Sequence, residues 1–118
     1  MNIEELDNYC LRKKGVKVST PFDDVTLVYK VMDKMFALTN IDRFVSVNLK
    51  CDPEYALELR ANHVEIQPGY HMSKKHWNTV IINEGLADER IYSLIDHSYN
   101  LVVKGLTKKA QKDLKEMK

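Results

Sequence analysis

Three β-like runs follow one another with almost no chain between them, and this spacing constrains the fold more than any other feature. The runs cover residues 25–32, 35–41 and 44–50, and the links are the polar dipeptides 33–34 and 42–43. Links of two residues join antiparallel neighbours as hairpins, whereas a parallel crossover needs about a dozen residues or more. The sequence therefore predicts a three-stranded antiparallel meander.

The third run alternates most clearly between apolar and polar side chains. Val45, Val47 and Leu49 point one way, and Ser46, Asn48 and Lys50 point the other. Successive side chains of a strand lie on opposite faces of the sheet. This alternation predicts a sheet that is covered on one face and wetted on the other.

Helical patterns stand on both sides of these runs, over residues 2–13, 53–62 and 88–104. Asp52 and Pro53 suit the cap and first turn of the second helix, and the third has the clearest 3.6-residue period. Shorter strands are expected over residues 64–67 and 76–83. Because helices do not alternate regularly with single strands, a parallel doubly wound sheet is disfavoured. We expect an α+β two-layer sandwich, with an antiparallel sheet of about five strands and the helices on one face.

Length and charge define a single domain without a strong electrostatic bias. The chain has 118 residues, with 18 Lys and Arg against 17 Asp and Glu. We expect one domain over residues 1–118. A net charge of +1 excludes a histone-like nucleic-acid binder and an acidic tail protein. Basic residues gather at 12–17, at 74–75 and in 107–118, a segment expected to form a frayed basic tail.

The cysteines and the N-terminus predict a reducing compartment. Cys10 and Cys51 stand in no metal-like spacing, and we expect free thiols. The first ten residues lack the apolar stretch of a secretory signal, and no run approaches the ~18 apolar residues of a membrane span. These features predict a cytoplasmic protein with no membrane contact. The spacing of His71 and His76 does not indicate a metal site, and no cofactor is expected.

The stretch around residues 69–78 is the strongest candidate site. Its polar and aromatic residues are Tyr70, His71, Lys74, Lys75, His76, Trp77 and Asn78. The lysines would hold phosphates, and Tyr70 or Trp77 would give a base a stacking surface. Alternatively, Trp77 belongs to the core and the lysines are ordinary solvated turn residues. Lys50, on the polar face of the third run, joins this candidate binding set.

Ser98 and Tyr99 on the last predicted helix form a second candidate. Ser98 lies on the apolar stripe, so we expect its hydroxyl to bond a carbonyl one turn back. Tyr99 lies at the edge of the stripe, and its hydroxyl is expected to reach another element. Either it is a packing anchor, or Tyr99 and His76 border one polar pocket. No serine stands in a nucleophile-elbow motif, so no catalytic residue is predicted.

Several short stretches together resemble the MmcQ/YjbR family of small bacterial proteins. They are residues 29–31 with 34–37, then residues 47–53, then Pro68-Gly69-Tyr70-His71-Met72 with Lys74-Lys75-His76-Trp77-Asn78, and finally Ser98-Tyr99-Asn100-Leu101-Val102 with Leu106. The resemblance covers residues 1–110. It implies a CyaY-like α+β fold and, because members are commonly labelled DNA-binding, contact with DNA. It carries over no catalytic residue.

Two functions follow as hypotheses. The first is non-catalytic, salt-dependent and weak DNA binding, with about four to six phosphate contacts if the three basic segments meet on one side. The second is a domain that binds a protein or a small ligand and has no nucleic-acid activity, which the near-zero net charge and the polar sheet face favour. An enzyme would need a pocket that joins His71 or His76 to Tyr99.

Overall fold

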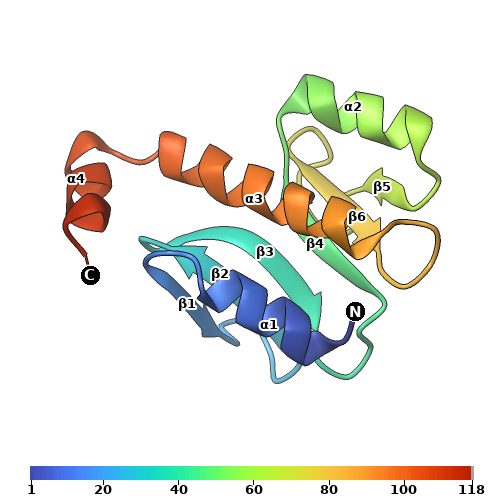
Figure 1. Cartoon of the computed structure of the whole chain (residues 1–118), viewed down its shortest axis with the longest axis horizontal. Coiled ribbons are helices and arrows are strands. Elements are labelled where there is room, and N and C mark those ends of the chain that lie inside the picture. Colours follow the sequence, from blue (N-terminus) through green and yellow to red (C-terminus); the bar gives the residue numbers. More distant parts are fainter. Residues whose placement is uncertain (118) are drawn as a thin grey trace.

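The protein is built from both helices and strands. The computed structural model describes residues 1–117 (Figure 1). Its elements, in chain order, are α1 (Ile3–Leu11), β1 (Val16–Ser19), β2 (Thr26–Val31), β3 (Lys34–Asn40), β4 (Ser46–Lys50), α2 (Pro53–Asn62), β5 (Ile66–Pro68), β6 (Trp77–Ile81), α3 (Asp88–Lys104) and α4 (Lys108–Glu116).

The strands form a single antiparallel sheet in the order β1-β2-β3-β4-β6-β5. The predicted α+β class and the central meander are therefore confirmed. The sheet has six strands among residues 1–117 rather than about five, because β1 was not foreseen. Only Val16 and Val18 are apolar in this edge strand, and four residues are too few for a clear alternating pattern.

Helices cover one face of the sheet. Figure 1 shows α1 and α3 lying across the same face, and α3 packs on β2, β3 and β4. Val47 and Leu49 of β4 point into this layer and are buried, as the alternation predicted. Val45 is 60% exposed instead, since β4 begins only at Ser46. The buried side chains of both layers are Leu6, Cys10, Tyr29, Phe36, Ala37, Val80, Ile91 and Ile95, among others.

The opposite face is less polar than the alternation of β4 predicted. Val28, Leu38 and Trp77 form a second buried cluster there, with Met35 and Met72 packed against it. Met72 comes from the loop between β5 and β6, so this loop covers part of the face that we expected to be wetted. β3 is consequently buried on both sides over Phe36–Thr39.

The tail from residue 107 is an anchored helix. Thr107 caps α4 by accepting a hydrogen bond from the Ala110 amide at 3.1 Å, and Leu114 is buried in the main core. α4 lies so close to Gly15 that a Cβ added there would stand 2.5 Å from Leu114 Cδ1. This packing contradicts the loose segment expected from the lysine-rich composition. Lys118, the last residue of that segment, lies outside the described residues.

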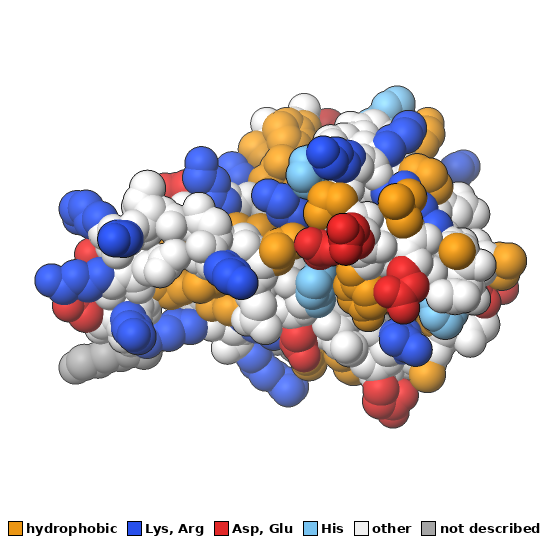
Figure 2. All heavy atoms as spheres, turned by 90° about the horizontal axis from the view of Figure 1, so that it is seen from above, with side chains coloured by type: hydrophobic (Ala, Val, Ile, Leu, Met, Phe, Trp, Pro, Cys, Tyr) orange, Lys and Arg blue, Asp and Glu red, His pale blue; other side chains and the backbone are white. Residues whose placement is uncertain are grey.

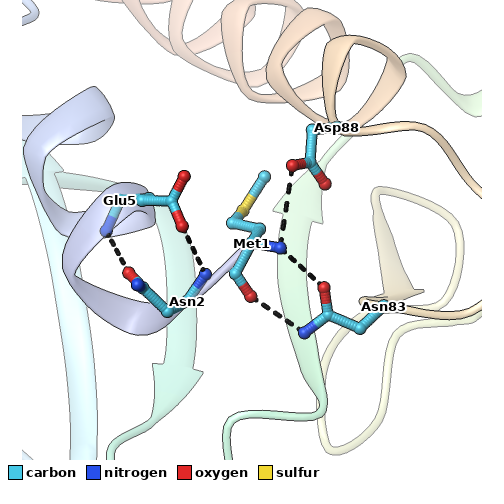
Figure 3. A network of polar contacts seen from close by, with 5 residues as sticks. All are labelled: Met1, Asn2, Glu5, Asn83 and Asp88. Carbon is cyan, nitrogen blue, oxygen red and sulfur yellow. Dashed lines mark hydrogen bonds and ion pairs between the residues drawn. The ribbon is translucent and has the colours of Figure 1, made fainter.

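The start of α1 is tied to the connection between β6 and α3 (Figure 3). Asn2 and Glu5 form a capping box, in which each side chain accepts a hydrogen bond from the backbone of the other. The Met1 amino group donates to Asn83 Oδ1 at 2.7 Å and lies 3.6 Å from the Asp88 carboxylate. The Asn83 amide in turn donates to the Met1 carbonyl at 2.8 Å. These contacts hold α1 in place over the sheet.

Candidate functional site

Tyr70 and His71 lie on the helix-free side of the sheet. The Tyr70 side chain is 68% exposed, and its ring centroid lies 4.0 Å from that of His71. The Tyr70 amide donates to Thr79 Oγ1 at 2.9 Å, and Thr79 donates to Asn48 Oδ1 at 2.6 Å. These bonds fix the backbone at Tyr70 to the sheet, while the Tyr70 and His71 side chains remain exposed.

The lysines of the same loop have different environments. Lys74 Nζ donates to the Gly69 carbonyl at 2.9 Å and so closes the loop. The Arg60 guanidinium of α2 donates to the Lys74 and Trp77 carbonyls and braces the loop from the helix side. Lys75 and His76 are exposed. Lys74 is exposed as well, so the two lysines differ in that only the Lys74 ammonium makes a hydrogen bond within residues 1–117.

Trp77 and Asn78 belong to the interior. Trp77 is 8% exposed and packs with Val28 and Leu38, so it offers no stacking surface to a base. Asn78 is 2% exposed, and its Oδ1 accepts a hydrogen bond from Arg60 Nε at 2.7 Å. Within the described residues its Nδ2 has no hydrogen-bond partner. Of the two interpretations of Trp77, the structure supports the core one.

Ser98 lies on α3, is fully buried, and links strands β3 and β4 through its hydroxyl. Its hydroxyl donates to the Phe36 carbonyl at 2.5 Å and accepts from the Lys50 amide at 2.9 Å. The expected bond to a carbonyl one turn back is therefore wrong. The register between β2 and β3 shifts beside Phe36, and the last paired residues of β3 and β4 are Ala37 and Leu49. Ser98 supplies a side-chain link where the ladder stops.

Tyr99 and His76 do not border one pocket. Tyr99 donates to the Lys14 carbonyl at 2.6 Å, so its hydroxyl reaches another element as expected. Its ring lies edge-on to Phe36, with 5.5 Å between the centroids. His76 is the last residue of the β5–β6 loop, and its carbonyl accepts a hydrogen bond from the Cys51 amide at 2.8 Å. The two residues therefore belong to different parts of the fold.

Several ionisable groups of the helix layer contact one another within the protein. Tyr9 donates to Asp96 Oδ1 at 2.7 Å, and Lys13 pairs with the same oxygen at 2.5 Å. Burial, together with the Asp96 carboxylate, raises the pKa of Tyr9 to about 12. Cys10 and Cys51 are free and buried, as the sequence predicted.

A cavity of about 480 Å³ opens on the helix-free side of the sheet. Tyr70, His71 and Met72 border it from the β5–β6 loop, and Phe22 and Asp23 border it from the β1–β2 loop. Tyr70 and His71 belong to the predicted binding set, whereas Met72 does not. Phe22 and Asp23 were not predicted either, and they lie about fifty residues away along the chain. The sequence does contain one signal that this face of the sheet is covered, the apolar run Met35–Leu38. Four apolar residues in succession indicate a strand that is buried on both faces.

A second cleft, of about 490 Å³, lies between α3, α4 and the turn after α1. Four lysines line it: Lys14, Lys108, Lys112 and Lys115. Its apolar lining includes Tyr99 and Leu114, and no acidic residue of the described chain lines it. Two of the three basic segments noted in the sequence therefore meet here. Figure 1 shows α4 at one end of the molecule, away from β5 and β6, so the 74–75 pair does not join them.

Residues 1–117 contain neither a metal-binding cluster nor a membrane-spanning helix. No group of three His, Cys, Asp or Glu side chains comes together there in a way that could hold a metal ion. None of the helices in that range has the length and apolar character needed to span a membrane.

The sequence model of the YjbR family matches residues 11–101. The YjbR protein of Escherichia coli K12 is 36% identical over 118 residues, which cover 99% of this chain and 100% of that protein. The chain belongs to the YjbR family. YbdF of Escherichia coli O157:H7 is 41% identical over 98 residues, covering 82% of this chain and 80% of YbdF. Both of these bacterial relatives are described as uncharacterised proteins.

Solved structures of YjbR-like proteins share the fold. The crystal structure of a Deinococcus radiodurans protein superimposes with a TM-score of 0.90 at 40% identity, covering 97% of this chain and 88% of that one. The crystal structure of a Pseudomonas syringae protein gives 0.72 at 33% identity, covering 86% of this chain and 98% of that one. The family and fold that the resemblance implied are therefore confirmed.

Proposed function

We propose that this YjbR-family protein binds DNA through the backbone phosphates, weakly and without reading bases. The observation that carries the proposal is the lysine-lined cleft beside α4. Lys108, Lys112 and Lys115 follow one another at helical spacing, and Lys14 faces them from the turn after α1. Four ammonium groups around one concave surface match the spaced negative charges of a nucleic-acid backbone.

None of the four lysines is in an ion pair within residues 1–117. Asp96 pairs with Lys13, and Asp113 pairs with Lys109 at 3.1 Å. Lys14 Nζ donates a hydrogen bond to the Lys115 carbonyl at 2.7 Å, and Glu116 at the end of α4 is exposed. Figure 2 shows Lys and Arg side chains gathered over the end of the molecule that carries α4. A local excess of positive charge on a nearly neutral protein supports backbone contact without strong overall affinity.

Fluorescence anisotropy of a labelled duplex of arbitrary sequence, measured at several salt concentrations, tests the proposal. Lys108→Ala/Lys112→Ala should weaken binding and reduce the salt slope by about 1.8, since each lost phosphate contact removes about 0.9. Arg43→Ala/Arg90→Ala removes equal charge from exposed residues outside the cleft and should leave the slope unchanged. Equal weakening by both double variants would overturn the assignment to the cleft.

The β5–β6 loop is a second contact that the same assay tests. Lys75 and His76 are exposed there, and Tyr70 presents an aromatic ring. Lys75→Ala is the informative variant, because Lys74 also closes the loop through Gly69. A flatter salt slope for Lys75→Ala extends the nucleic-acid surface to this loop. An unchanged slope confines the contact to the α4 end.

A further inference from the structure

We infer that the cavity on the helix-free side of the sheet binds a small organic cation with an apolar body, such as a protonated arylalkylamine. This inference is independent of the proposed DNA contact, because the lysine-lined cleft and this cavity share no lining residue. It rests on the size of the cavity, its apolar floor, its aromatic rim and the sign of its charge.

The cavity has the dimensions of a small-molecule site. Its volume of about 480 Å³ lies within the ~300–1,000 Å³ range of ligand pockets. It is bounded by two loops, and one of these is fixed to the sheet. The Asn48 amide donates to the Tyr70 carbonyl at 3.3 Å, and the Tyr70 amide donates to Thr79 Oγ1 at 2.9 Å. One wall of the site is therefore in place before a ligand arrives.

The floor is apolar and adaptable. Leu38, Met35 and Met72 line it, and they rest on the buried side chains of Val28 and Trp77. Methionine side chains adjust to irregular shapes and make favourable contacts with aromatic rings. A floor of this kind fits the hydrocarbon or aromatic part of a ligand.

Two exposed aromatic rings stand at the rim. Phe22 is 64% exposed and Tyr70 is 68% exposed, although both line the cavity. Ligand pockets are lined predominantly by hydrophobic and aromatic side chains, so two aromatic rings at the rim of one concave surface fit a binding site. The face of such a ring also attracts an organic cation.

The charge of the lining selects the sign of the ligand. Asp23 is the acidic residue of the lining within residues 1–117, and neither Lys nor Arg of that range lines the cavity. Hydrogen bonds from the Val25 amide, the Thr26 amide and the Thr26 hydroxyl hold the pKa of Asp23 below its ordinary value. The other ionisable side chains of the lining are those of Tyr70 and His71. A fixed carboxylate with no facing ammonium favours a cation and repels a phosphate or a carboxylate.

Polar groups are also present to orient a ligand. The Ser46 hydroxyl and the Asn40 amide nitrogen line the cavity and make no hydrogen bond within the described part of the chain. Asn40 Oδ1 accepts from the backbone of the following turn, so its NH₂ is directed away from that turn. These groups would orient a ligand whose charge lies near Asp23 and whose apolar body lies on the floor of the cavity.

NMR of protein labelled at the methionine methyls, titrated with three indoles of different charge, tests the inference. The probes are tryptamine, neutral 3-methylindole and indole-3-acetate. We expect tryptamine to shift the Met35 and Met72 signals and to leave Met32 and Met117 unchanged, since the latter pair lines a different surface. Tryptamine should bind about threefold to tenfold more tightly than indole-3-acetate, because attraction to the exposed Asp23 carboxylate is replaced by repulsion.

Three variants make the result decisive. Asp23→Asn keeps an oxygen acceptor for the two amides and should bring the affinities of tryptamine and indole-3-acetate close to each other. Asp33→Asn removes the same charge at a turn outside the cavity and should keep the preference. Ser46→Phe fills the cavity and should abolish the methionine shifts. Equal binding of both charged indoles by the wild type, or no shift at Met35 and Met72 with any probe, would overturn the inference.

Discussion

Replacing Ser98 by Ala should destabilise the protein strongly, although it removes a single oxygen. The hydroxyl satisfies two buried backbone groups, the Phe36 carbonyl and the Lys50 amide. An unpaired buried polar group costs about 1–3 kcal/mol, so two cost about 2–4 kcal/mol at the lower end of that range. Alanine is the better helix former and recovers about 0.5 kcal/mol. The net loss is about 1.5–3.5 kcal/mol, a large share of a typical ~5–15 kcal/mol free energy of unfolding.

Urea denaturation followed by circular dichroism measures this loss. Ser93→Ala is the matched control, since Ser93 is exposed on the same helix and its replacement should change stability by less than ~0.5 kcal/mol. At about 4 °C per kcal/mol for this chain length, Ser98→Ala should lower the melting temperature by about 6–14 °C. If Ser98→Ala were within ~0.5 kcal/mol of the wild type, the hydroxyl would not be bridging β3 and β4, and the structural explanation of this serine would be refuted.

Two further predictions concern the packing of α4 against Gly15 and the burial of the two cysteine thiols. Gly15→Ala should cost about 2 kcal/mol in a thermal melt, because residue 15 has φ +75° and the new Cβ would meet Leu114 Cδ1 at 2.5 Å; an unchanged melting temperature would contradict the docking of α4. Stability should also fall in alkali. Burial raises the pKa of Cys10 to about 12 and that of Cys51 to about 11, from 9.0 in the unfolded chain. Because the fold favours the neutral thiols, their stabilisation is complete below pH about 9 and is lost as the pH rises toward their folded pKa values. The urea midpoint should fall between pH 8.5 and 11, and a constant midpoint would disprove this.

The parts of the fold that depend on local sequence were predictable. Short links force neighbouring strands to be antiparallel. The first turn lies at Met32 and Asp33, one residue before the predicted link 33–34, and both residues have positive φ, of 48° and 67°. The second connection runs from Ile41 to Val45 and is longer than the predicted link 42–43. β1 was not predictable, because it is an edge strand with two apolar residues. The place of β6 between β4 and β5 depends on distant pairing, which no local pattern encodes.

The candidate residues show the same division. The stretch 69–78 is correctly singled out as unusual, yet the structure divides it into exposed residues, such as Tyr70 and Lys75, and buried ones, such as Trp77 and Asn78. A polar residue in a sequence does not reveal whether its partner is water or a distant backbone group. Ser98 is the clearest case, since its two partners lie 62 and 48 residues away along the chain.

The sequence alone likewise does not show that the two basic segments face each other across one cleft. Composition shows lysines near residue 14 and after residue 107, but only the docking of Leu114 beside Gly15 brings them around one cleft. The lysines of the β5–β6 loop lie elsewhere. Charge counting along the chain therefore overestimates the number of phosphates that one surface can contact.

The salt dependence of DNA binding by the wild-type protein tests the central claim most directly. Four phosphate contacts at the α4 cleft predict a slope of about −3.6 for the logarithm of the association constant against the logarithm of salt concentration. Affinity for an arbitrary duplex should therefore fall about 150-fold between 50 and 200 mM salt. Anisotropy titrations that give this slope support the account. Absence of binding at 50 mM salt, or binding that salt leaves unchanged, would contradict it.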